Sequence, residues 1–310
     1  MSCVELTGLR ADLPIGVMAA LGCLRVLERT SGWQGSKLAW KRTGQGFHAT
    51  LWTQEEKDRE GLVAALIEDV KGAADRKELL WSEQIKTATR ESFVEHAKLA
   101  LAGDDGLPDW FAAFGSDLEL DAEGRIEPTP FDMSVARQKF LADARKLAMG
   151  LAEARGLESG KTAGSYREAL FGPWQYKDDQ HSLGWDPSTM KLGAFTYKAP
   201  TAMANAGVRA AVWLAFESLP LFPCFCNHGL QTLGFRRQGR REVAFCWPVW
   251  EAPISLAAVR VLLGATLVIE DSSAEALQAR GVTAIFRSTK FKPNKYLANF
   301  RAPELAATTR

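Results

Sequence analysis

The hydrophobic pattern near the N-terminus predicts a buried helix followed by a β-hairpin. Residues 14–29 are apolar nearly all round, which is typical of a helix enclosed by a core, and Pro14 suits its first turn. Gly22, in the middle of this helix, costs about 1 kcal/mol relative to alanine, so we expect another element to pack closely there. Two strand-like runs, 37–42 and 47–52, follow and are separated by a glycine-containing turn. The chain is therefore predicted to open as mixed α and β structure.

The middle of the chain shows helical periodicity. Residues 55–77 and 81–101 are predicted to be helical, whereas residues 108–130 lack a period and are predicted to be irregular. A long amphipathic helix is predicted over residues 135–154, with Ser134 as its N-cap, because apolar side chains recur on one face.

The last third of the chain alternates aromatic loops, short helices and strands. Residues 171–200 are rich in aromatic residues, glycine and proline, and are predicted to form an ordered loop region. The pattern then predicts, in order, a helix over 208–219, a hairpin of strands 230–237 and 243–247 with its turn at 238–241, a helix over 255–263 and a strand over 283–288.

These elements together predict an α+β fold with two lobes. The N-terminal lobe, residues 1–130, contains the buried helix, the first hairpin and an acidic helical segment. The second lobe, residues 131–310, contains a helical segment followed by antiparallel strands and short helices around a basic hairpin.

Composition places the chain among ordinary globular proteins. Of its 310 residues 46% are hydrophobic, which is enough for a sizeable core. It has no run of about eighteen apolar residues, so we expect no membrane span, and its first residues lack the features of a signal peptide. Five cysteines at uneven spacing argue against a disulfide framework, so we expect a cytoplasmic protein.

Charge is unevenly distributed although the net charge is only +1. Residues 55–127 carry 19 acidic and 9 basic residues, a net charge of −10, whereas residues 227–301 carry 11 basic and 5 acidic residues, a net charge of +6. This pattern fits a strongly dipolar molecule whose two ends meet different partners, and it also fits two differently solvated faces.

Metal-binding and catalytic patterns are weak. Four candidate zinc ligands are Cys224, Cys226, His228 and Cys246. Zinc sites usually have two pairs of closely spaced ligands, and the second pair is missing here, so buried thiols are the preferred interpretation. The run from Asp178 to His181, which includes Asp179, is the one hint of a metal-dependent nuclease and is more typical of a hydrated turn. Phosphate-binding glycine loops and nucleophile elbows are absent from the sequence. We therefore predict a non-catalytic protein that binds no metal and no cofactor.

Basic residues near the second hairpin are the best candidates for a nucleic-acid contact. Four arginines cluster at its predicted tip, where they have no folding role, and further along the chain cations alternate with aromatic residues. Cations bind phosphates and aromatic rings stack on bases, although the same alternation arises in a half-buried strand. The residues predicted to act as phosphate clamps or groove readers are Arg236, Arg237, Arg240 and Arg241. Those predicted to contact the nucleic-acid backbone are Arg287, Lys290, Lys292 and Lys295. Asn227 and Gln231 are predicted to hydrogen-bond base edges.

Five stretches of the sequence together carry a family resemblance. The most specific is A-L-F-G-P-W-Q-Y-K-D-D-Q-H-S-L-G-W-D-P at residues 169–187. The others are residues 6–27, 137–148, 213–223 and 245–256. In their order along the chain, these stretches resemble the large-subunit family of CRISPR type I-G (formerly I-U) Cascade complexes, or a closely related accessory protein. The chain departs from the family at residues 132–136, where a Thr-Ser-Gly-Gln run is more usual, and it is shorter than many large subunits.

The resemblance implies a non-catalytic role inside an RNA-guided ribonucleoprotein. Such subunits contact the protospacer-adjacent motif, help to open the duplex, hold the displaced strand and recruit the helicase-nuclease, while guide pairing supplies sequence specificity. The implied partners are the backbone subunits with CRISPR RNA, double- and single-stranded target DNA, and the helicase-nuclease. The alternative is a protein–protein adaptor of the helicase-nuclease that does not read DNA.

Overall fold

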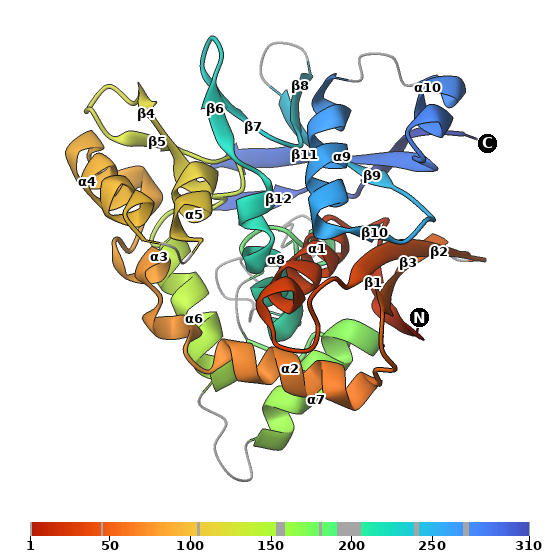
Figure 1. Cartoon of the computed structure of the whole chain (residues 1–310). Helices are drawn as coiled ribbons and strands as arrows, with labels where there is room; N and C mark the ends of the chain where they lie inside the picture. Colours follow the sequence, from red (N-terminus) through yellow and green to blue (C-terminus); the bar gives the residue numbers. More distant parts are fainter. Residues whose placement is uncertain are drawn as a thin grey trace, which may run out of the picture.

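The computed structural model describes residues 2–44, 46–103, 106–152, 159–179, 182–190, 206–238, 242–268 and 273–309. The fold is α+β, as predicted, because antiparallel sheets and helices share one structure. Two helices, α1 (Pro14–Arg29) and α8 (Arg209–Glu217), lie in the middle of the molecule (Figure 1). The larger sheet lies on one side of this pair, and helices α2 (Arg59–Val70) and α7 (Ser159–Phe171) lie on the other (Figure 1).

The first sheet combines three N-terminal strands with one strand from the last third of the chain. Its strands, in order across the sheet, are β1 (Ser2–Arg10), β3 (Gly46–Thr53), β2 (Lys37–Thr43) and β10 (Ile254–Ser255). The hairpin predicted from the sequence is β2 and β3, which pair directly from Lys37 to Thr43. Strand β1 was not predicted, and β10 reaches this sheet from the C-terminal third of the chain.

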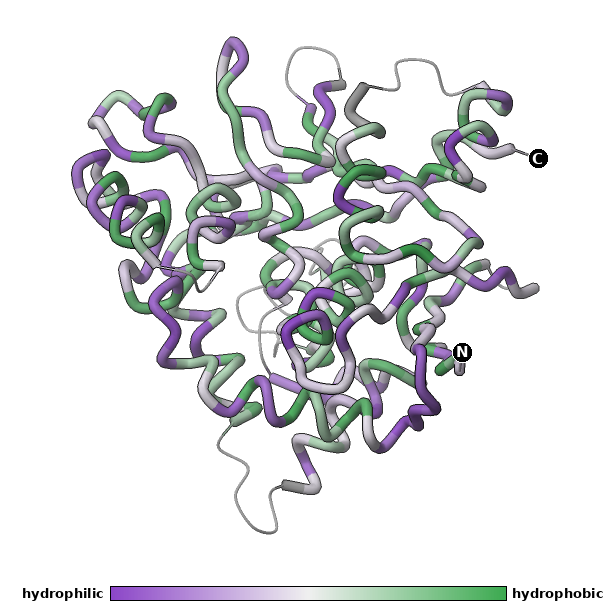
Figure 2. The backbone as a smooth tube through the Cα atoms, viewed as in Figure 1, coloured by the Kyte–Doolittle hydropathy of each residue, from purple (hydrophilic) through white to green (hydrophobic). Residues whose placement is uncertain are grey.

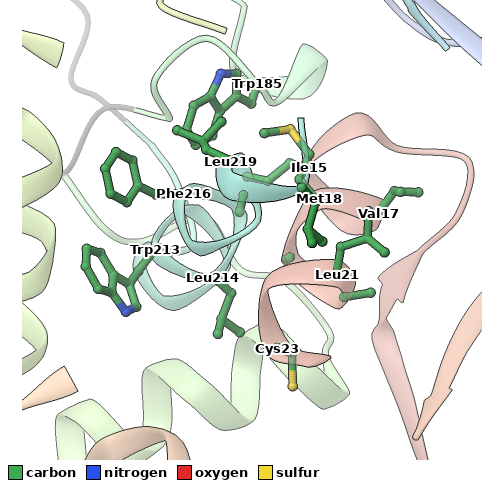
Figure 3. Close-up of a cluster of buried hydrophobic side chains, with 14 of the residues drawn as sticks. Ile15, Val17, Met18, Leu21, Cys23, Trp185, Trp213, Leu214, Phe216 and Leu219 are labelled. Carbon is green, nitrogen blue, oxygen red and sulfur yellow. The ribbon is translucent and has the colours of Figure 1, made fainter. Parts of the chain in front are cut away.

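Helix α1 has the predicted bounds and packs against α8 (Figure 3). The apolar side chains at this contact include Ile15, Met18, Leu214 and Leu219. The helix backbones meet at Gly22, where an added Cβ atom would lie 1.7 Å from the carbonyl oxygen of Leu214. The close packing predicted for Gly22 is thus confirmed.

The acidic segment is divided into shorter elements than predicted. They are α2 (Arg59–Val70), η1 (Ala73–Asp75), α3 (Lys77–Leu80), η2 (Ile85–Thr87), α4 (Arg90–Leu101), α5 (Leu107–Phe114), β4 (Gly115–Leu120) and β5 (Ile126–Pro128). Asp58 and Thr89 accept backbone hydrogen bonds at the starts of α2 and α4, which gives each helix a polar N-cap. The prediction of irregular structure over 108–130 was wrong, because Pro108 lies in the first turn of α5, where proline is tolerated.

The long helix predicted over 135–154 begins later than expected. Helix α6 (Phe140–Ala152) is followed by α7 (Ser159–Phe171). Ser134 does not cap α6; its backbone N–H donates to Asp132 Oδ1 and its hydroxyl contacts Lys86. The predicted N-cap was therefore wrong, because Ser134 belongs to a turn with hydrogen bonds of its own.

The larger sheet has the order β12 (Leu297–Phe300), β11 (Ala284–Asn294), β9 (Glu242–Val249) and β8 (Phe235–Gln238), and β13 (Glu304–Thr308) pairs with β11. The predicted basic hairpin corresponds to β8 and β9, but residues 230–232 do not extend β8. They form β7 (Leu230–Thr232), which pairs with β6 (Cys224–Cys226) in a separate two-stranded sheet.

The remaining elements of the described residues are η4 (Pro187–Thr189), η7 (Leu219–Leu221), α9 (Leu256–Val268) and α10 (Ala274–Ala279).

Among the described residues, most of the buried apolar side chains belong to a cluster that includes residues from both predicted lobes. Phe131 lies within 6.5 Å, between ring centroids, of Phe222, Phe235, Phe245 and Phe300. Along the outer helices hydrophobic and hydrophilic positions alternate (Figure 2), which is typical of helices with one face on a core. The division of the chain into two lobes near residue 130 stays a prediction.

In the part of the chain that the structure describes, each helix lacks either the length or the apolar composition of a membrane span.

Candidate nucleic-acid interface

A basic cavity of about 340 Å³ lies beside β8, the edge strand of the larger sheet. Five cationic side chains and two carboxyl groups are among the residues that line it. The cations are Lys86, Arg236, Arg237, Lys290 and Lys292, and the carboxyl groups belong to Glu127 and Asp132. Five of the ten nucleic-acid contacts predicted from the sequence line this cavity, namely Gln231, Arg236, Arg237, Lys290 and Lys292.

The cations reach the cavity from two strands of the larger sheet. Arg236 pairs with Ala244 and Arg237 with Val243 on the edge strand β8, and both arginines line the cavity although consecutive strand residues point to opposite faces. Lys290 and Lys292 are two residues apart on β11, a spacing that directs strand side chains to the same face. Arg236 is half-buried, whereas Arg237 and Lys292 are exposed. The positive charge therefore extends from the cavity to the surface.

Lys290 lies inside the cavity rather than along a solvent-exposed strand. Its Nζ donates to the carbonyl oxygens of Pro130 at 2.9 Å and Asp132 at 3.2 Å. Burial lowers the pKa of Lys290 to about 8, although the nearby Asp132 carboxylate opposes this shift. The alternative interpretation of this segment, a half-buried strand with aromatic residues inward and cations outward, does not describe Lys290. Phe291, the next residue, instead packs with its ring 4.5 Å from the guanidinium of Arg301.

Asp132 and Lys86 belong to the wall formed by the N-terminal half of the chain. Burial raises the pKa of the Asp132 carboxyl. Asp132 Oδ1 accepts a hydrogen bond from the backbone of Ser134, and within the described parts of the chain its buried Oδ2 has no partner. Lys86 Nζ donates to Ser134 Oγ at 3.0 Å. Sequence reasoning missed Lys86, because it is a single lysine in an acidic segment and no local motif marks it.

The cations of this cavity differ from the other basic residues of the protein in their partners. Within the described residues, none of the five forms an ion pair with a carboxylate. Arginines elsewhere commonly do so, as in the pairs Arg29–Asp69 and Arg260–Asp109. Arg236 Nη2 is buried and has no hydrogen-bond partner among the described residues. A buried donor of a charged group is costly unless an acceptor reaches it, so the cavity is suited to an anionic ligand.

The other predicted contacts do not line the cavity. Arg287 forms an ion pair with Glu304 at 2.5 Å. Lys295 Nζ lies 5.1 Å from the centroid of the Tyr296 ring, and Asn227 is exposed in the turn between β6 and β7. Arg240 and Arg241 lie outside the described residues.

The candidate metal ligands are not gathered in the described structure. No three His, Cys, Asp or Glu side chains of the described residues are placed to hold a metal ion. The Cys224 thiol donates to the carbonyl oxygen of Ala113, and burial raises its pKa to about 11. Asp178 Oδ2 accepts the backbone N–H of Arg209 at 2.7 Å, at the start of α8, and His181 lies outside the described residues.

Fold and site together define an α+β protein with a cation-lined cavity at the edge of its larger sheet. No family model, no curated protein and no solved structure matches this chain.

Proposed function

We propose that this chain is a non-catalytic, cytoplasmic subunit of a CRISPR type I interference complex that contacts target DNA through the basic cavity and helps to recruit the helicase-nuclease. The observation that carries the proposal is the convergence of Arg236, Arg237, Lys290, Lys292 and Gln231 on one cavity. The family resemblance of the sequence supplies the identity of the complex.

The chemistry of the cavity supports a contact with a nucleic-acid backbone. Phosphate contacts supply most of the affinity of proteins for nucleic acids, and cations without carboxylate partners are free to make them. Gln231, at the border of the cavity, adds an amide that can hydrogen-bond a base edge. A net charge of only +1 is compatible with this role, because affinity in a multi-subunit complex is shared among several contacts.

Co-expression with its genomic neighbours and a CRISPR array tests membership of the complex. We expect the tagged chain to elute from gel filtration in a large particle that contains a discrete short RNA. Elution of the chain alone, at its own mass of 34.0 kDa and without RNA, would show that it is not a stable subunit. An array whose repeats are scrambled serves as the control, because it lacks the processed guide around which the particle assembles.

Replacing Arg237 by alanine tests the DNA contact itself. We expect weaker binding of duplexes regardless of their sequence, with a dependence of log affinity on log salt that is shallower by about 0.9, because one phosphate contact is lost. Filter binding over a range of salt concentrations measures both quantities. Arg167→Ala is the matched control, because this exposed arginine pairs with Glu60 and does not line the cavity. Equal losses in the two variants would contradict a specific contact at Arg237.

An adaptor function is the second candidate, and exposed apolar residues in the acidic part of the chain favour it. Leu99, Leu101 and Leu118 are 65%, 73% and 71% exposed. Large exposed apolar side chains are typical of protein contacts, and the surrounding acidic residues suit a basic partner. Retained assembly together with unchanged DNA affinity in Arg237→Ala would favour the adaptor over the DNA-contacting subunit.

A further inference from the structure

We propose that the cavity beside β8 binds a single internal phosphate of a nucleic-acid strand, with Arg236 and Lys86 as its direct donors. The identity of the strand rests on the proposed function, whereas the anion site rests on the geometry of the cavity. The assignment joins a residue of the acidic N-terminal half to one of the basic C-terminal part, so the site spans the two halves of the chain.

Arg236 has the strongest requirement for an anion. Its Nη2 is buried and unpartnered within the described structure, although the guanidinium carries a full positive charge. The fork of N–H groups in arginine matches two oxygens of one phosphate. A phosphate at this position would supply the acceptor that Arg236 lacks.

Lys86 presents a second donor to the same cavity. Its ammonium has three N–H groups, and its two acceptors in the described structure both belong to Ser134, namely Oγ at 3.0 Å and the carbonyl oxygen at 3.4 Å. These contacts direct the ammonium and leave one donor for a ligand. Because neither acceptor is charged, Lys86 retains its attraction for an anion.

The charge inside the cavity favours an anion although two carboxyl groups are present. The charge of the Asp132 carboxylate is offset by the nearby ammonium of Lys290, and each group favours the charged form of the other. Burial raises the pKa of Asp132, which favours its neutral form near an anion. Glu127 then remains against Lys86, Arg236, Arg237 and Lys292, so positive charge predominates.

The position of the outer cations points to an internal phosphate rather than a terminal one. Arg237 and Lys292 line the cavity and are exposed, so positive charge continues beyond Arg236 and Lys86. A strand that places one phosphate in the cavity can therefore place its neighbours along Arg237 and Lys292. A terminal phosphate would leave one of these outer cations without a ligand.

The test uses the full chain and a single-stranded DNA oligonucleotide of about 20 nucleotides with a 5′-hydroxyl, followed by fluorescence anisotropy. We expect Lys86→Met and Arg236→Gln each to lower affinity about ten-fold at low salt, with a salt dependence shallower by about 0.7, because each variant loses one phosphate contact of a single strand. Lys146→Met, which removes an exposed lysine outside the cavity, controls for net charge and is expected to bind like the wild type. Thermal unfolding of each variant verifies that it is folded.

Three outcomes would overturn the assignment, and they differ in what else they affect. Wild-type affinity in both Lys86→Met and Arg236→Gln would show that these residues do not bind a phosphate, and it would leave the proposed function intact. Stabilisation of the protein by inorganic phosphate, without binding of any oligonucleotide, would support an anion site and contradict both the strand and the proposed function. A markedly higher affinity for the same oligonucleotide with a 5′-phosphate would show that the site takes a terminal phosphate.

The same binding measurement at different pH values adds an independent readout. Lys290 lies in the cavity, where it is surrounded by Lys86, Glu127, Asp132, Arg236, Arg237 and Lys292. Because the pKa of Lys290 is lowered to about 8, this lysine loses its charge as the pH rises through that value. We expect affinity for the oligonucleotide to fall over this range, and to fall much less in Lys290→Met. An equal fall in both proteins would show that Lys290 does not influence the site.

Discussion

Replacing Glu217 by glutamine is expected to lower the free energy of unfolding by about 3–5 kcal/mol, because the change leaves the buried guanidinium of Arg25 without its counter-ion and removes one of the two carboxylates that Arg29 and Arg76 share. Glu217 is fully buried at the end of α8 and accepts hydrogen bonds from Arg25 at 2.8 Å and from Arg76. Arg29 Nη2 lies 3.0 Å from its carboxylate. Three guanidinium groups from α1 and from the segment after η1 therefore converge on this carboxylate. Arg29 and Arg76 also pair with Asp69, whereas Glu217 is the carboxylate that pairs with Arg25 among the described residues.

The same carboxylate should make the protein sensitive to acid. Burial raises the pKa of Glu217, but the three surrounding arginines lower it more, so the pKa falls from its ordinary value of 4.5 to about 2. A carboxyl group whose pKa is lower in the folded state contributes stability that is complete above the unfolded value and is lost as the pH falls through the folded value. The contribution of Glu217 should therefore decline between about pH 4.5 and about pH 2.

Urea unfolding of the wild type and of Glu217→Gln at neutral and acidic pH measures both effects. The difference between the two proteins should be largest at neutral pH and should shrink on acidification. Glu60→Gln is the matched control, because Glu60 is exposed and its pair with Arg167 is screened by solvent, so we expect little change. A Glu217→Gln protein as stable as Glu60→Gln would show that the arginines find other partners.

This ion cluster also shows what could not be predicted from the sequence. Arg25 interrupts an apolar run, and nothing near it in the sequence indicates its partner, since Glu217 lies 192 residues away. Helix α1 itself was predicted with its observed bounds, because its burial depends on a local pattern of apolar residues. Ion pairs between distant segments depend on tertiary packing, which no local pattern encodes.

The residues of the candidate site also divide into those that a local pattern predicts and those that only tertiary packing brings to the cavity. Arg236 and Arg237 were predicted because basic residues beside a hairpin turn form a local pattern, and Lys290 and Lys292 because cations alternate with aromatic residues in that part of the sequence. Lys86 was missed because it reaches the cavity only through the packing of η2 against β5 and through its hydrogen bonds to Ser134. The cap predicted at Ser134 was wrong because Asp132, two residues earlier, holds its backbone in a turn. A serine before an amphipathic run does not distinguish these two uses.

Replacing Gly22 by alanine is expected to destabilise the protein by about 3 kcal/mol or more, because overpacking against backbone atoms forces the two central helices apart. The added methyl group would lie 1.7 Å from the Leu214 carbonyl oxygen and 3.1 Å from the Ser218 nitrogen, and backbone atoms cannot rotate away as a side chain would. Urea unfolding measures the loss.

A second glycine in a helix separates this clash from the general effect of the substitution. Gly164→Ala in α7 meets no atom within 4 Å, so we expect a gain of about 0.5–1 kcal/mol from the higher helix propensity of alanine. Alanine would favour α1 by the same amount if only propensity mattered at Gly22. Opposite signs for the changes in the free energy of unfolding would therefore show that position 22 requires glycine because α1 approaches α8 closely there, and not because of helix propensity. Equal gains would contradict the observed contact between the helices.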